Sequence, residues 1–106
     1  MPTYIHLNVM FVSGWQKRMK IYDNADLHKL NYRVQEIIHK KMYDDGYNLN
    51  GMNYELIHDD EILEDVYDTS HTLFDMDIKD GDTINVIVIK ALKREEEVVG
   101  NTKYKK

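Results

Sequence analysis

Several histidine and carboxylate side chains stand close together in this sequence, and such groups are the usual material of metal and acid–base sites. Residues 58–61 read His-Asp-Asp-Glu, and residues 75–82 carry four aspartates around Gly81. The first four side chains are consecutive, so they would point in different directions around a turn. A calcium loop also needs a closing glutamate, and Ile87 stands at that position. We therefore expect no metal site and no cofactor.

The other residues offer no familiar catalytic arrangement. The chain has no cysteine, and its remaining histidines are scattered over separate segments. No serine lies in a nucleophile-elbow pattern, and no glycine-rich loop follows a strand in phosphate-binding form. We therefore expect that the protein is not an enzyme.

Composition narrows the classes of partner. The 106 residues suffice for one domain with a modest core. The net charge of −5 argues against a general nucleic-acid partner, because phosphate binding needs a basic face. No basic segment precedes an apolar run at the N-terminus, and no apolar run approaches the ~20 residues that span a bilayer. Together with the absence of cysteine, these features predict a cytoplasmic protein without a membrane partner, a monomer when free.

Charge is distributed unevenly along the chain. Residues 59–82 are strongly acidic, whereas residues 28–41 are comparatively basic. The two segments are either two solvated faces of one domain or a dipolar surface that steers a charged partner.

Hydrophobic periodicity predicts the strands that must position these groups. Residues 4–12 alternate between apolar and polar side chains, and a serine-glycine turn separates them from a second strand at Gln16–Tyr22. Further strands are expected at residues 54–58, 61–63 and 83–90. The last of these is nearly continuous in β-branched residues, which is typical of a central strand.

One helix is predicted between the second and third strands. Apolar residues recur at helical spacing from Leu27 to Met42, with charged residues on the other face. Asp23, Asn24 and Asp26 offer N-caps, and residues 44–51 are expected to end the helix in a loop. A lone helix in this order must cover one face of a small mixed sheet, with the first and last strands paired in its middle. The predicted fold is α+β, of the β-grasp type.

At this point the sequence resembles ubiquitin. The stretch TLFDMDIKDGDTINVIVIK (residues 72–90) carries the pattern that leads into ubiquitin's last strand, and ELIHDDEIL (residues 55–63) matches the length and Leu-Ile core of its third and fourth strands. The resemblance covers about residues 4–90. It implies a ubiquitin-like domain at residues 1–90, followed by a flexible C-terminal tail at residues 91–106.

The resemblance also implies a surface for partners. Ubiquitin binds its partners through an apolar patch on the exposed sheet face, and two residues of that patch fall on Ile57 and Ile87. Strand alternation points Ile87 and Ile89 away from the helix. Ile57, Ile87 and Ile89 are therefore expected to bind partners, unless the loops or the tail cover them. Ubiquitin's patch leucine has no match here, and Trp15 would supply an apolar contact in its place.

The sequence ends with VVGNTKYKK, which resembles the C-terminus of a ubiquitin-like modifier before its processing. Ubiquitin-like modifiers react through a terminal glycine, because a side chain near the reacting carbon would block a narrow channel. Many are made with residues after this glycine that a peptidase removes. The resemblance implies processing after Gly100, although the acidic residues 95–97 replace basic residues of ubiquitin. The alternative is a disordered tail that contains a glycine.

The resemblance thus implies a ubiquitin-like protein modifier. Its partners would be a processing peptidase, an activating enzyme, a conjugating enzyme and target proteins, to which Gly100 would be joined by an isopeptide bond. The alternative is a non-conjugated ubiquitin-like interaction module, such as an accessory protein of a type VII-like secretion system.

Overall fold

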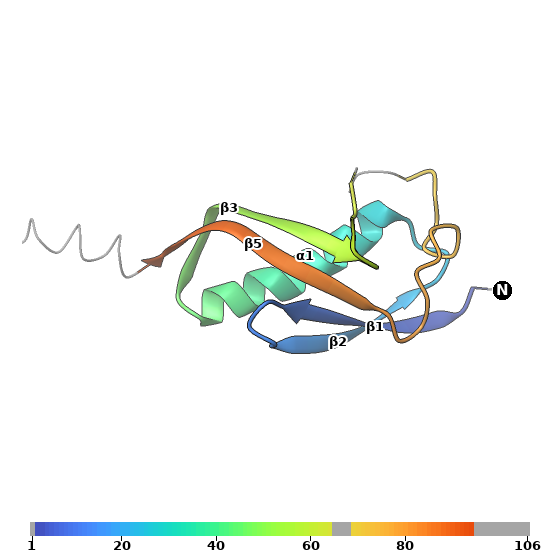
Figure 1. Cartoon of the computed structure of the whole chain (residues 1–106), viewed down its shortest axis with the longest axis horizontal. Coiled ribbons are helices and arrows are strands. Elements are labelled where there is room, and N and C mark those ends of the chain that lie inside the picture. The colour runs from blue at the N-terminus through green and yellow to red at the C-terminus, as the bar shows by residue number, and fades with distance from the viewer. Residues whose placement is uncertain (1, 65–68, 95–106) are drawn as a thin grey trace, which may run out of the picture.

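A five-stranded mixed sheet with a helix packed on one face forms the body of the molecule (Figure 1). The computed structural model describes residues 2–64 and 69–94. Its elements are, in chain order, β1 (Tyr4–Phe11), β2 (Gln16–Tyr22), α1 (Leu27–Asp44), β3 (Tyr47–His58), β4 (Glu61–Ile62) and β5 (Thr83–Lys93). The strand order across the sheet is β2-β1-β5-β3-β4, with β1 and β5 parallel to each other. The predicted α+β class and β-grasp arrangement are confirmed.

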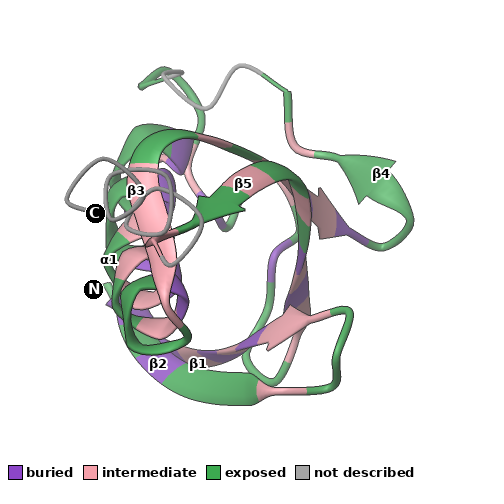
Figure 2. Cartoon of the chain, turned by 90° about the vertical axis from the view of Figure 1, so that its left-hand side faces the viewer, coloured by how far each residue is buried: buried purple, intermediate pink, exposed green. Residues whose placement is uncertain are grey.

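The core lies between the sheet and α1 and is built from alternate residues of the central strands. Leu7 and Val9 of β1 and Ile84 of β5 are fully buried, and they face Leu30 and Val34 of α1 in the same apolar cluster. In Figure 2 the buried segments line the interior between helix and strands. Each such side chain stabilises the fold by about 1.5–3 kcal/mol relative to an exposed position.

Helix α1 begins where the sequence predicts it. The Asp26 side chain accepts a hydrogen bond from the Lys29 backbone N–H at 2.7 Å, which satisfies one of the free amide groups of the first turn. The helix ends at Asp44, and Gly46 follows in the left-handed region with φ 95°. Glycine adopts this conformation without the penalty that a Cβ would bring.

Two strands are longer than predicted. Strand β3 begins at Tyr47, whereas a loop was expected at residues 44–51, and β5 continues beyond residue 90 to Lys93. The two extensions pair with each other, Tyr47 with Lys93 and Asn48 with Leu92. The asparagines and glycine of this segment disfavour a strand on their own, and the long-range pairing supplies the missing hydrogen bonds.

Within residues 2–64 and 69–94, the structure contains no helix that is both long and apolar enough to cross a membrane.

Candidate functional site

Four isoleucines gather on the sheet face that points away from α1. This isoleucine patch consists of Ile57, Ile62, Ile87 and Ile89. Ile57 lies between the buried Leu56 and His58, so its own side chain points outward, and it stands opposite Ile62 across the β3–β4 pair.

The geometry brings two predicted patch residues together. Asn85 pairs with Ile57, and Ile87 lies two residues further along β5, so Ile87 is a diagonal neighbour of Ile57 at about 7–8 Å. Ile87 and Ile89 are 39% and 57% exposed, whereas Ile57 is half-buried. Ile89 falls at a shift in register between β3 and β5.

Ile62 was missed by the sequence analysis, although its signal was present. A two-residue turn at Asp59 and Asp60 joins β3 to β4, and both residues have positive φ, 50° and 65°. Such a turn fixes the register, so residue 62 must stand opposite residue 57. Ile62 is 51% exposed and extends the patch to the edge of the sheet.

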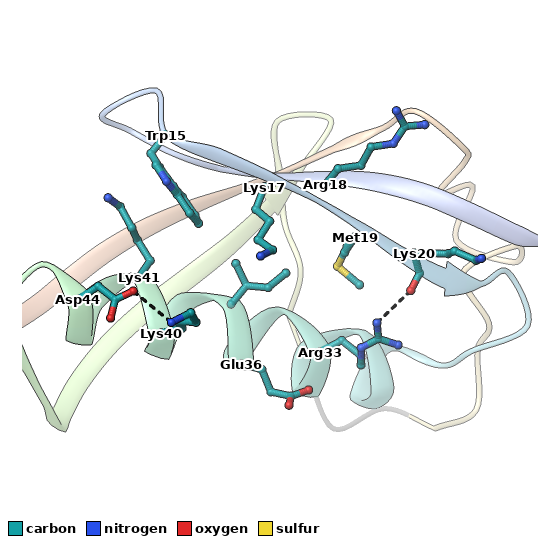
Figure 3. Close-up of a pocket in the computed structure, with 11 residues that line it drawn as sticks. Trp15, Lys17, Arg18, Met19, Lys20, Arg33, Glu36, Lys40, Lys41 and Asp44 are labelled. Atoms are coloured by element: carbon teal, nitrogen blue, oxygen red, sulfur yellow. Dashed lines mark hydrogen bonds and ion pairs between the residues drawn. The ribbon is translucent and has the colours of Figure 1, made fainter.

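Trp15 lies away from the isoleucine patch. Its ring makes an edge-to-face contact with Phe11, at 5.4 Å between centroids, and Lys41 of α1 places its Nζ 5.0 Å from the Trp15 centroid. The side chain therefore points to the helix side of the sheet, as Figure 3 shows. Trp15 does not take the place of ubiquitin's patch leucine beside Ile57 and Ile87.

Trp15 instead lines a groove of about 550 Å³ between β2 and α1, which we call the basic groove. Its lining residues are Trp15, Lys17, Arg18, Met19, Lys20, Arg33, Glu36, Ile37, Lys40, Lys41 and Asp44. Six of them are basic and two are acidic, in a chain whose net charge is −5. The apolar contribution comes from Trp15, Met19 and Ile37.

The groove follows a free edge of the sheet. Strand β2 is the outermost strand, and its odd-numbered residues bond toward β1, as the Phe11 N–H to Trp15 carbonyl bond of 2.8 Å illustrates. The backbone groups of Gln16, Arg18 and Lys20 consequently point toward the open edge. The Lys20 carbonyl accepts a hydrogen bond from Arg33 Nη2 at 3.1 Å, which closes one end of the groove (Figure 3).

The basic side chains of the groove are held by few ion pairs. Lys40 lies 3.3 Å from Asp44, and Lys41 lies 3.1 Å from Asp45, both within one turn of α1. The Lys40–Asp44 pair is exposed and contributes little to stability, whereas the Lys41 side chain is mostly covered. The lining as a whole still has more basic than acidic residues. The groove can therefore attract an extended, acidic segment, with backbone hydrogen bonds to β2 adding to the charge attraction.

Of the carboxylates of residues 59–61, Asp59 lies near His58, with its Oδ2 3.7 Å from His58 Nε2. His58 is buried on the core side, where its Nε2 lies 2.8 Å from Asp82 Oδ2, while Asp59 and Asp60 occupy the exposed turn. Asp82 also accepts the Lys79 backbone N–H at 2.9 Å. Burial raises the pKa of Asp82, but the hydrogen bonds from Lys79 and His58 and their charges bring it below its usual value.

The aspartates of residues 75–82 serve the loop that leads into β5. Asp75 accepts the Thr72 N–H, and Asp80 accepts the His6 backbone N–H at 2.7 Å. This backbone hydrogen bond, with that of the His6 ring, lowers the pKa of the Asp80 carboxyl. In the part of the chain that the structure describes, no three histidine or acidic side chains are grouped as metal ligands would be.

Gly100, the predicted point of processing, lies outside the described residues. The last described residue, Arg94, leads toward it. The Arg94 N–H donates to the Gly46 carbonyl at 2.7 Å, and its guanidinium stacks 3.9 Å from the Tyr43 ring centroid. The chain thus leaves β5 beside the last turn of α1.

Comparison with known proteins supports the fold at the level of structure. No family model matches the sequence, and no curated protein matches it. A ubiquitin of Caldiarchaeum subterraneum aligns over 83% of this chain and 96% of its own, with a TM-score of 0.54 and 17% identity. A ubiquitin-like domain of an Arabidopsis thaliana protein aligns over 86% of this chain and 92% of its own, with a TM-score of 0.59 and 19% identity. The chain has the ubiquitin-like β-grasp fold.

Proposed function

We propose that this protein is a ubiquitin-like protein modifier, processed after Gly100 and conjugated through that residue to target proteins in the cytoplasm. The supporting observation is the combination of a ubiquitin-like body with a chain that continues past β5 to a glycine and a basic extension. Hydrolysis of the peptide bond between Gly100 and Asn101 would free the Gly100 carboxylate. An activating enzyme, using ATP, and a conjugating enzyme would then join this carboxylate to an amine. Catalysis belongs to these partners.

The length of the arm supports this proposal. Because β5 ends at Lys93, the residues between the strand and Gly100 are 94–99, which extend to about 20 Å. An arm of this length reaches into a partner's active site while the body remains outside it. The isoleucine patch would dock the body on the partner, through Ile57, Ile87 and Ile89 together with Ile62.

The experiment is a comparison of Gly100→Ala with Asn101→Ala in the native host. Attached forms are separated by mass from the free protein, digested, and searched for remnants of this C-terminus on other proteins. The proposal predicts that wild type and Asn101→Ala form adducts through Gly100, whereas Gly100→Ala forms none. Equal adduct formation by Gly100→Ala would exclude attachment through this glycine.

The second candidate is a non-conjugated interaction module, favoured by the two partner surfaces on the folded body. The isoleucine patch and the basic groove lie on opposite faces of the sheet and need no reactive terminus. This candidate predicts that the protein recovered from its host still ends at Lys106 and is unattached. Its binding partners would be lost on changing Ile87 to Asp and kept on changing Gly100 to Ala.

A further inference from the structure

The basic groove has chemistry that is matched within the same chain. Residues 95–99 read Glu-Glu-Glu-Val-Val, three acidic side chains followed by two β-branched apolar ones. The groove offers four basic side chains (Lys17, Arg33, Lys40 and Lys41), an apolar floor and backbone groups of an edge strand, whereas the Arg18 side chain points away from it in Figure 3 and Lys20 lies over the Tyr4 ring. We infer that the chain's own C-terminal segment, residues 95–99, docks in the basic groove between β2 and α1. Docking itself does not depend on conjugation, whereas the regulatory role drawn from it rests on the proposed function of Gly100.

The path of the chain brings this segment to the groove. Arg94 is anchored on Tyr43 and Gly46, at the last turn of α1. The same turn carries Lys40, Lys41 and Asp44, which line the groove on the other side of the helix. A helix with its side chains is about 10–12 Å across, so the segment has only to pass around one helix end to reach Lys41.

The length of the segment allows it to enter the groove. Five extended residues span about 17 Å. The passage around the helix end takes about 10 Å of this, and the rise of α1 from Lys41 to Ile37 is about 6 Å at about 1.5 Å per residue. Residues 95–99 are therefore long enough to turn around the helix end and to reach Ile37.

Charge decides which end of the groove the acidic residues occupy. Figure 3 shows Trp15, Lys17 and Lys41 directed into the groove from its two walls, at the end near Asp44. Lys41 is mostly covered, with its side chain 22% exposed, so its charge is less screened than that of a fully exposed lysine. Residues 95–97 reach this end first, and Val98 and Val99 then lie against the apolar floor at Met19 and Ile37.

Docking would give the segment a regulatory role. With residues 95–99 held against β2, Gly100 lies on the body and is withdrawn from enzymes that act on an extended chain. A partner that binds the groove competes with the segment and releases Gly100. Residues 95–97, which are acidic where ubiquitin has basic residues, would supply the charges that bind this segment to the groove.

The test uses the full chain and its single tryptophan, Trp15, as reporter. The variant Glu95→Gln/Glu96→Gln/Glu97→Gln is compared with wild type by amide 1H–15N spectra and by tryptophan emission. A matched control, Glu55→Gln/Glu61→Gln/Glu64→Gln, removes three charges outside the groove. We expect the first variant alone to shift the amide signals of residues 16–20 and 37–41 and to move Trp15 emission to longer wavelength. The ratio of docked to undocked chain should fall by roughly tenfold.

High salt, charge reversal and dilution provide further tests of docking. About 1 M NaCl, where the Debye length is about 3 Å, should move the wild-type signals to those of the tail variant. Lys17→Glu should undock the segment, whereas Lys79→Glu, a charge reversal at an exposed lysine away from the groove, should not. Superimposable groove signals in wild type and tail variant would overturn the inference. If a roughly hundredfold dilution releases the segment, the occupant is the tail of a second copy, and docking within one chain is refuted.

Discussion

Replacing Asp82 tests how the loop before β5 is held to the sheet. Asp82 accepts hydrogen bonds from the His58 ring at 2.8 Å and from the Lys79 backbone at 2.9 Å, and its side chain is 29% exposed. Asp82→Ala removes both bonds and leaves the buried His58 without this partner. Hydrogen bonds to a charged group contribute about 1.5–3 kcal/mol each, and partial exposure favours the lower end. We therefore expect the free energy of unfolding to fall by about 2–3 kcal/mol.

Thermal unfolding monitored by circular dichroism measures this change. For a domain of this size, 1 kcal/mol corresponds to about 4–8 °C, so Tm should fall by roughly 8–24 °C at neutral pH. Glu64→Ala, which removes an exposed carboxylate just after β4, is the control and should change Tm little.

The pH dependence gives a second, independent check. The pKa of Asp82 is lower in the folded protein than its ordinary value of 3.8, so its stabilisation is fully present above that value. The stabilisation is lost as the pH falls through the folded-state pKa. The Tm difference between wild type and Asp82→Ala should therefore shrink in acid. A difference that is absent at neutral pH, or that stays constant in acid, would refute this account of the loop.

Three other substitutions test the fold that carries the two surfaces. Leu30→Ala, at a fully buried position of α1, should lower the free energy of unfolding by about 3–4 kcal/mol in urea titrations; a loss below 1 kcal/mol would contradict its place in the core. Asp26→Ala should lower the free energy of unfolding by about 1 kcal/mol, because it removes the hydrogen bond that the Lys29 N–H donates at the start of α1. Asp26→Asn keeps an acceptor and should stay close to wild type, and equal losses in both variants would exclude capping. Asp60→Gly should raise stability by about 0.5–1 kcal/mol, because φ is 65° there, and a destabilised variant would argue against the two-residue turn.

The folded body was largely predictable because its signals are local. Alternation in β1, helical spacing from Leu27 to Met42 and the β-branched run before residue 90 each specify one element and one buried face. The N-cap at Asp26 was among the predicted choices. The start of β3 at Tyr47 was not predictable in this way, since its polar residues become a strand only by pairing with the end of β5.

The candidate surfaces were predictable only in part, for a related reason. Strand alternation predicted the face of Ile87, whereas Ile57 was assigned from the resemblance to ubiquitin. The two become neighbours through the pairing of β3 with β5. Trp15 was assigned to the wrong neighbours, because the assignment followed the position of ubiquitin's first turn. Alternation with Met19 and Ile21 along β2 places Trp15 on the helix side. The basic groove depends on how far α1 stands from the free edge of β2, a distance that arises only when the chain is folded.

The anchoring of Arg94 has a consequence for any enzyme that acts on the C-terminus. Three contacts fix this residue: its N–H to the Gly46 carbonyl, its guanidinium to the Tyr47 carbonyl at 3.3 Å, and its stacking on Tyr43. Five residues, 95–99, separate Arg94 from Gly100, and the six Cα–Cα steps between them span at most about 20 Å. The covalent chain therefore limits Gly100 to within about 20 Å of Arg94. An enzyme that holds the folded body must therefore place its reactive centre within this distance of Arg94.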